Sequence, residues 1–85
     1  MKLIFCRTCQ DVRKLGYIKT SCTCGSSWGW YEQDGLHAVI GGRAIPIGFA
    51  NLSFSEALAN QTKRGRGLEF VAFVIPEKCD TIERM

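Results

Sequence analysis

The chain has 85 residues, of which 46% are hydrophobic and 22% are charged, and its formal net charge is +3. This length leaves room for one domain with a thin core and none for a separate catalytic module, and the balanced composition argues against a disordered chain. No stretch reaches the roughly 18 uninterrupted apolar residues of a membrane span. We therefore expect one domain over residues 1–85, with no membrane contact, whose fold needs an additional staple such as a metal ion.

The N-terminus carries no recognisable secretion signal. The short apolar run Met1–Phe5 leads straight into Cys6 and leaves no hydrophobic region or cleavage site. A cytoplasmic location is therefore expected, where cysteines stay reduced and serve as metal-binding thiolates more often than as disulfides. The odd number of cysteines, five, points the same way.

The first half of the chain predicts short strands joined by turns. The apolar run Lys2–Phe5 predicts a strand that leads into the first cysteine, and a second strand is expected over Arg13–Thr20. Residues 28–40 predict a β-hairpin, because Asp34-Gly35 is a strong turn signal between two apolar runs.

The second half predicts an edge strand, one helix and a final strand. The stretch Ala44–Phe49 is apolar, but Pro46 restricts it to a sheet edge or an irregular segment. A Ser-x-x-Glu capping box that begins at Ser53 predicts the only helix, near residues 54–62. Residues 68–75 are rich in β-branched and aromatic side chains and predict a strand at the centre of a sheet.

Four of the cysteines form two close pairs that suit a metal site. Cys6 and Cys9 are separated by two residues, Cys22 and Cys24 by one, and 12 residues lie between the pairs. Zinc prefers four soft ligands in a tetrahedron, and two close pairs on separate turns supply two of its edges. We therefore expect one structural zinc ion, whose removal unfolds at least the N-terminal third of the chain.

The spacing of the second pair leaves the identity of the fourth ligand undecided. In an extended strand, two cysteines separated by one residue point to opposite faces, so the chain from Cys22 to Gly25 must bend sharply, which a glycine permits. If Cys22 is not a ligand, Cys79 is the candidate substitute. Four thiolates also suit iron, which keeps a mononuclear iron site open.

Through Cys6-x2-Cys9 and Cys22-x-Cys24-Gly25 the chain resembles the zinc-ribbon and rubredoxin-like zinc-knuckle families. It departs from their usual pattern in having one residue instead of two in the second pair. The whole layout is similar to small uncharacterised zinc-ribbon proteins of bacteria and phages, so the cytoplasm would be that of the host for a phage-encoded chain. Together with the strands, hairpin and helix expected above, this predicts an α+β, mainly β fold, in which a zinc ribbon over residues 1–27 merges into a small antiparallel sheet with one short helix.

Aromatic and basic side chains suggest a nucleic-acid surface as one alternative. Trp28 and Trp30 share a strand face and could stack on bases, and Lys63, Arg64 and Arg66 form a glycine-flanked basic loop that could contact phosphates. The competing interpretations are that the two tryptophans pack on a thin core and that the basic loop is an ordinary solvated turn.

No set of residues predicts catalysis. His37 is the only histidine, and the carboxylates are scattered without a pair at motif spacing. We therefore expect a zinc-stabilised binding or regulatory module with a protein partner and no enzymatic activity. Nucleic-acid binding and an iron electron carrier remain the alternatives, and the oligomeric state stays open.

Overall fold

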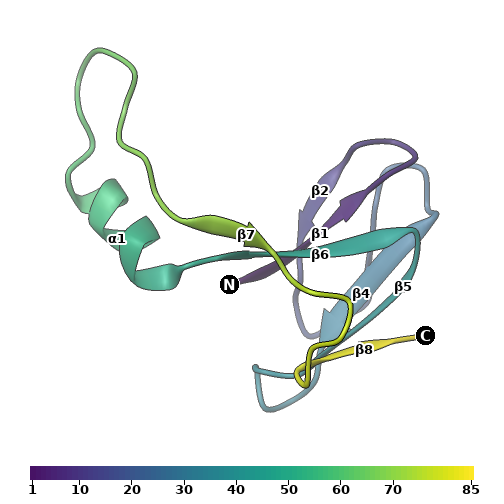
Figure 1. The fold of residues 1–85 in the computed structure, drawn as a ribbon. Coiled ribbons are helices and arrows are strands. Elements are labelled where there is room, and N and C mark those ends of the chain that lie inside the picture. The colour runs from purple at the N-terminus through teal and green to yellow at the C-terminus, as the bar shows by residue number, and fades with distance from the viewer.

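The computed structural model describes residues 1–85 as eight strands and one helix (Figure 1). The elements are β1 (Lys2–Cys6), β2 (Val12–Lys14), β3 (Thr20–Ser21), β4 (Ser27–Tyr31), β5 (Ala38–Gly42), β6 (Ala44–Phe49), α1 (Asn51–Ala59), β7 (Ala72–Val74) and β8 (Ile82–Arg84). The predicted fold class, α+β and mainly β, is confirmed.

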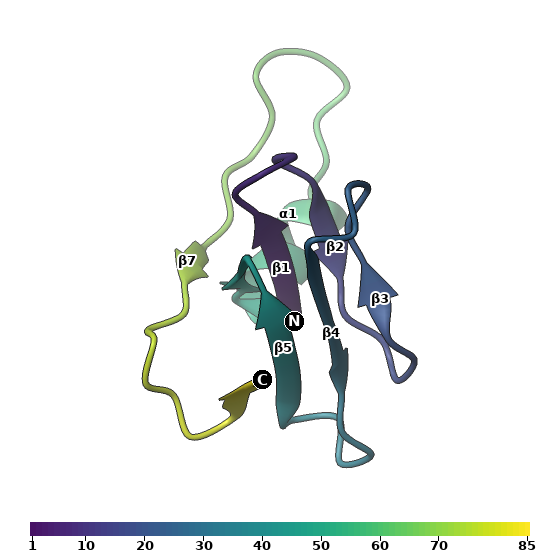
Figure 2. The same cartoon turned by 90° about the vertical axis from the view of Figure 1, so that its right-hand side faces the viewer.

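The strands form two four-stranded sheets. The first has the order β2-β1-β6-β7, with all neighbours antiparallel. The second has the order β3-β4-β5-β8, in which β8 runs parallel to β5. The predicted hairpin is present as β4 and β5, which pair from Tyr31 with Ala38 to Ser27 with Gly42. Figure 2 shows the strands of both sheets with α1 behind them.

A small apolar cluster holds the two sheets together. It consists of Ile4, Leu15, Ala38, Ile40 and Ala44, all at most 2% exposed, so it joins the cysteine-rich N-terminal segment to the rest of the chain. Only 15 of the 85 residues are buried, as the short length led us to expect.

Gly29 lets the hairpin approach this cluster closely. A Cβ atom at that position would lie 3.0 Å from the Leu15 side chain and 2.9 Å from the carbonyl oxygen of Val39. A side chain there would push β4 away from the cluster.

The strand expected over Arg13–Thr20 is wrong as one element, because the chain leaves one sheet for the other within it. The amide of Leu15 donates to Lys2 O in β1 at 3.2 Å, and Gly16 O accepts from the amide of Tyr31 in β4 at 2.7 Å. Only its two ends are strands, one in each sheet, as β2 and β3.

The prediction that Pro46 restricts its segment to an edge is also wrong, since β6 lies between β1 and β7. Pro46 O accepts from the amide of Ile75 at 2.9 Å, just past the end of β7. In an antiparallel strand the N and O atoms of one residue point to the same side. The nitrogen of Pro46, which carries no hydrogen, therefore points to the β7 side, so the pairing of β6 with β1 loses no hydrogen bond.

The helix begins earlier than predicted, at Asn51 after the N-cap residue Ala50, and ends at Ala59. Ser53 does not cap it. Its hydroxyl donates to Ala50 O at 3.0 Å and accepts from the amide of Val71 at 2.9 Å. The predicted capping box is therefore wrong, because the hydroxyl instead ties α1 to the start of β7.

The central strand expected over residues 68–75 is a short edge strand. Only Ala72–Val74 pair, on the outside of β6, and all three are exposed. Phe70 packs instead against Phe49 and Phe54, with ring centroids 4.9 and 4.7 Å away. The β-forming composition of residues 68–75 therefore does not place them in a buried central strand. Part of their apolar surface packs on α1 instead.

Candidate metal centre

The first cysteine pair lies in the turn between β1 and β2. Cys6 ends β1, and its backbone closes the turn, since its amide donates to Asp11 O at 2.9 Å and its carbonyl accepts from the amide of Gln10 at 2.8 Å. Gln10 has a φ of 60°, a left-handed conformation that reverses the chain after Cys9. The loop thus folds Cys9 back towards Cys6.

The second pair lies in the turn between β3 and β4. The amide of Cys22 donates to Ser27 O at 2.9 Å, and the amide of Gly25 donates to Cys22 O at 3.0 Å. Gly25 has a φ of 79°, which glycine adopts without steric cost. The sharp bend predicted for the second pair is therefore present, and Cys22 and Cys24 point to a common centre.

The two turns bring four sulfur atoms into one cluster. The Sγ atoms of Cys6, Cys9, Cys22 and Cys24 all lie within 4.8 Å of one another. The Sγ of Cys24 is 3.7 Å from that of Cys6 and 3.6 Å from that of Cys22. A tetrahedral zinc site with Zn–S bonds of about 2.3 Å has S–S edges of about 3.8 Å. The cluster therefore has the dimensions of a four-thiolate metal site and could bind a metal ion.

Two serines beside the cluster favour thiolates over thiols. The Ser26 hydroxyl lies 3.3 Å from Cys6 Sγ and 2.9 Å from Cys24 Sγ. The hydrogen bond from Ser26 is the main cause that lowers the pKa of the Cys6 thiol to about 5. The Ser27 hydroxyl is fully buried and has no hydrogen-bond partner. A buried donor without a partner fits a site whose sulfur atoms are negatively charged.

Asp11 joins the two turns, and sequence reasoning did not single it out. Its Oδ2 atom accepts from the amide of Thr23 at 2.9 Å, from the Thr23 hydroxyl at 2.8 Å and from Arg13 Nε at 2.7 Å. These donors, Arg13 first, lower the pKa of Asp11 to about 2. The only signal in the sequence is that Asp11 is the one carboxylate among the basic side chains of residues 1–30.

Cys79, the candidate substitute ligand, lies outside the cluster. Its Sγ is 3.3 Å from the Thr81 hydroxyl, which with the Thr81 amide lowers the pKa of the thiol. It lines a hollow together with Lys2, at the end of β1 away from Cys6. The fourth sulfur of the cluster is that of Cys22.

The candidate nucleic-acid residues do not share one face. Trp28 and Trp30 are half-buried on β4, where Lys19 Nζ lies 5.1 Å from the centroid of the Trp28 ring. Lys63, Arg64 and Arg66 are exposed in the loop that follows α1, which stands away from β4 at the other end of the molecule (Figure 1). The aromatic pair and the basic loop are therefore two separate features.

His37 lies in the exposed turn of the β4–β5 hairpin. Its Nδ1 pairs with Oδ2 of Asp34, whose other oxygen accepts from the amides of Leu36 and His37, each at 2.9 Å. The backbone bond from Leu36, then the His37 side chain, lower the pKa of Asp34 to about 2. His37 thus serves the turn and is not part of the cysteine cluster.

Comparison with protein-family models, curated proteins and solved structures found no match. No helix in the structure has the length and apolar character needed to cross a membrane. The cysteine cluster is consistent with a zinc-ribbon-like knuckle on its own geometry.

Proposed function

We propose that this protein is a small binding module whose fold is stabilised by one structural zinc ion. The observation that carries the proposal is the cluster of four cysteine sulfurs with tetrahedral dimensions. The ligands would be Cys6, Cys9, Cys22 and Cys24. When bound, zinc would supply a cross-link between the β1–β2 and β3–β4 turns and no redox chemistry.

The donor set supports a structural role over a catalytic one. Four thiolates complete a tetrahedron and leave no position for water or substrate, whereas catalytic zinc sites keep one position open. The chain then needs the metal because its apolar cluster has only five fully buried members. The remaining surface is available to a partner, and we propose a protein as that partner.

Metal analysis with cysteine variants tests the zinc site. Purified protein should contain one zinc per chain, and Cys24→Ser, at the exposed cysteine of the cluster, should lower that content sharply. Cys79→Ser is the matched control and should keep the metal. Loss of metal in Cys79→Ser, or full metal content in Cys24→Ser, would contradict the proposed ligand set.

The same preparation separates zinc from iron. Ferric iron held by four thiolates absorbs visible light, whereas zinc does not, because its d shell is full. A colourless protein with bound zinc supports the structural module. A coloured protein with stoichiometric iron would replace it by an electron carrier.

Affinity capture tests the partner. Zinc-loaded protein immobilised through a C-terminal tag should retain a protein from native lysate, and protein stripped of metal should not. A gel shift with single- and double-stranded oligonucleotides at about 50 mM salt tests the alternative, since binding through phosphates weakens steeply with added salt. Nucleic-acid binding without protein capture would favour that alternative.

A further inference from the structure

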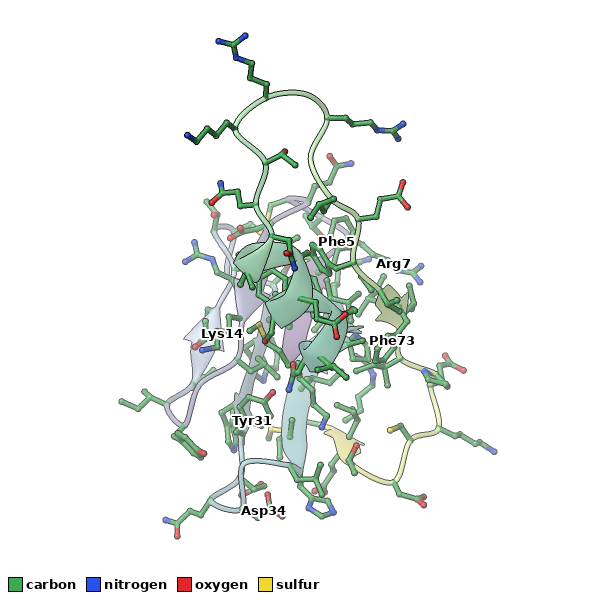
Figure 3. The ribbon with its side chains drawn as sticks, turned by 90° about the vertical axis from the view of Figure 1, so that its left-hand side faces the viewer. Phe5, Arg7, Lys14, Tyr31, Asp34 and Phe73 are labelled. Carbon is green, nitrogen blue, oxygen red and sulfur yellow. The ribbon has the colours of Figure 1, made fainter.

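The helix α1 stands between two hollows and buries none of its own residues. The first hollow, about 270 Å³, lies between α1 and the loop of residues 60–71. The second, about 630 Å³, lies between α1 and the side of the β-strands that carries Lys14 and Tyr31. In Figure 3, where α1 faces the viewer, Lys14 lies to one side of the helix and Tyr31 below it.

The two hollows share an apolar floor. Phe54 and Leu58 of α1 line both of them, and Leu68 and Phe70 extend the floor of the first. Leu58 is 59% exposed and Leu68 is 49% exposed, although both are aliphatic. Covering aliphatic side chains this exposed would contribute favourable free energy to the binding of a partner.

The charged side chains that line the two hollows are all positive. Lys63, Arg64 and Arg66 line the first hollow and Lys14 lines the second, whereas neither lining contains a carboxylate. None of these four cations has a carboxylate within salt-bridge distance. Glu56 of α1 and Glu69, next to Leu68 in the chain, are exposed but line neither hollow, so the hollows themselves present only positive charge.

We infer that this surface around α1 binds an acidic segment of a partner protein that carries apolar anchor side chains. The apolar floor would take the anchors, and the four cations would face the carboxylates. The inference rests on the proposed function of a protein-binding module and assigns it a site and a class of partner.

An acidic peptide fits this surface better than a nucleic acid. Proteins that bind single-stranded nucleic acids stack the bases on free aromatic faces. Here Phe54 and Phe70 pack on each other, with ring centroids 4.7 Å apart, so they are less available for stacking. The side chains left free are the aliphatic Leu58 and Leu68, which suit leucine-like anchors.

The test uses zinc-loaded full-length protein labelled with ¹⁵N and a short synthetic peptide in which glutamates and aspartates flank two leucines. The amide signals of Phe54, Leu58 and Leu68 should shift on titration. The same peptide with serine in place of leucine, or with amides in place of the carboxylates, should bind at least about fivefold more weakly.

Matched charge variants locate the site. Lys63→Ala with Arg64→Ala should weaken peptide binding about fivefold, whereas Arg43→Ala with Lys78→Ala, which removes the same charge elsewhere, should not. Leu58→Ser should weaken binding about tenfold with the fold intact, because the side chain is largely exposed.

Three results would overturn the inference. They are absence of peptide binding, equal loss in both charge variants, and tighter binding of an oligonucleotide than of the peptide at the same amides. Concentration-dependent shifts of these amides without any peptide would instead assign the surface to a second copy of the chain. If the peptide fails while affinity capture still returns a protein partner, only this inference fails and the proposed function stands.

Discussion

Asp11 in the first cysteine turn holds Thr23 in the second by two hydrogen bonds to one carboxylate oxygen, from the Thr23 amide at 2.9 Å and its hydroxyl at 2.8 Å. Thr23 lies between Cys22 and Cys24, so this contact fixes the short second pair relative to the first. The protein itself therefore positions the two turns, and a metal ion would complete a cross-link that these bonds already orient.

Replacing Asp11 should loosen the metal site without removing a ligand. Asp11→Ala loses all three bonds, and we expect zinc affinity to fall about tenfold, as for other residues that support metal ligands. Asp11→Asn keeps an acceptor for Thr23 but loses the charge that faces Arg13, so its loss should be smaller. Competition with a chromophoric chelator measures both, with Asp80→Ala as the control for a lost surface charge.

The expected order of the loss in zinc affinity is Asp11→Ala first, Asp11→Asn second and Asp80→Ala last. Equal zinc affinity in Asp11→Ala and the unmodified chain would show that the bond between the turns does not support the site. A loss as large in Asp80→Ala would show a general charge effect.

Gly41 should not accept a side chain. Its Cβ would lie 2.5 Å from the Trp28 ring across the hairpin, so Gly41→Ala forces the indole to move. We expect a loss of about 1–3 kcal/mol in the free energy of unfolding, together with a change in tryptophan fluorescence. Urea denaturation of the zinc-loaded protein measures the first quantity.

Gly16→Ala is the matched glycine control, since a Cβ there meets nothing within 4 Å. It should leave stability unchanged or raise it by up to about 1 kcal/mol, because alanine restricts the unfolded chain. If Gly41→Ala were as well tolerated as Gly16→Ala, the packing of Trp28 on β5 would be wrong.

Ile40 should carry a large share of the stability, since it is 1% exposed in the cluster that joins the two sheets. Ile40→Ala should lower the free energy of unfolding by about 2–5 kcal/mol. Leu52→Ala, at a leucine that is 74% exposed on α1, should change it by less than about 0.5 kcal/mol. Comparable losses in the two variants would contradict the placement of the core.

The features that could be predicted from the sequence are encoded over short distances. The hairpin of β4 and β5 follows from Asp34-Gly35 between two apolar runs. The approach of the four cysteines follows from two close pairs, each in its own turn. In both, neighbouring residues determine the geometry.

The features that were missed depend on distant partners. β8 pairs in parallel with β5, but its core contact comes from Ile82 alone, so three residues give no periodicity to detect. Pro46 is tolerated inside a sheet only because β7 ends opposite it. Phe70 lies outside β7 because its ring packs against Phe49 and Phe54, which are distant in the sequence.

The most direct test of the central claim, that a metal bound to the four cysteines stabilises this fold, is an amide NMR spectrum recorded before metal removal, after it and after zinc is returned. We expect the dispersed signals of β1 to β5 to collapse when a chelator removes the metal under reducing conditions, and to return with one equivalent of zinc. An unchanged, dispersed spectrum of protein shown to be free of metal would contradict the claim.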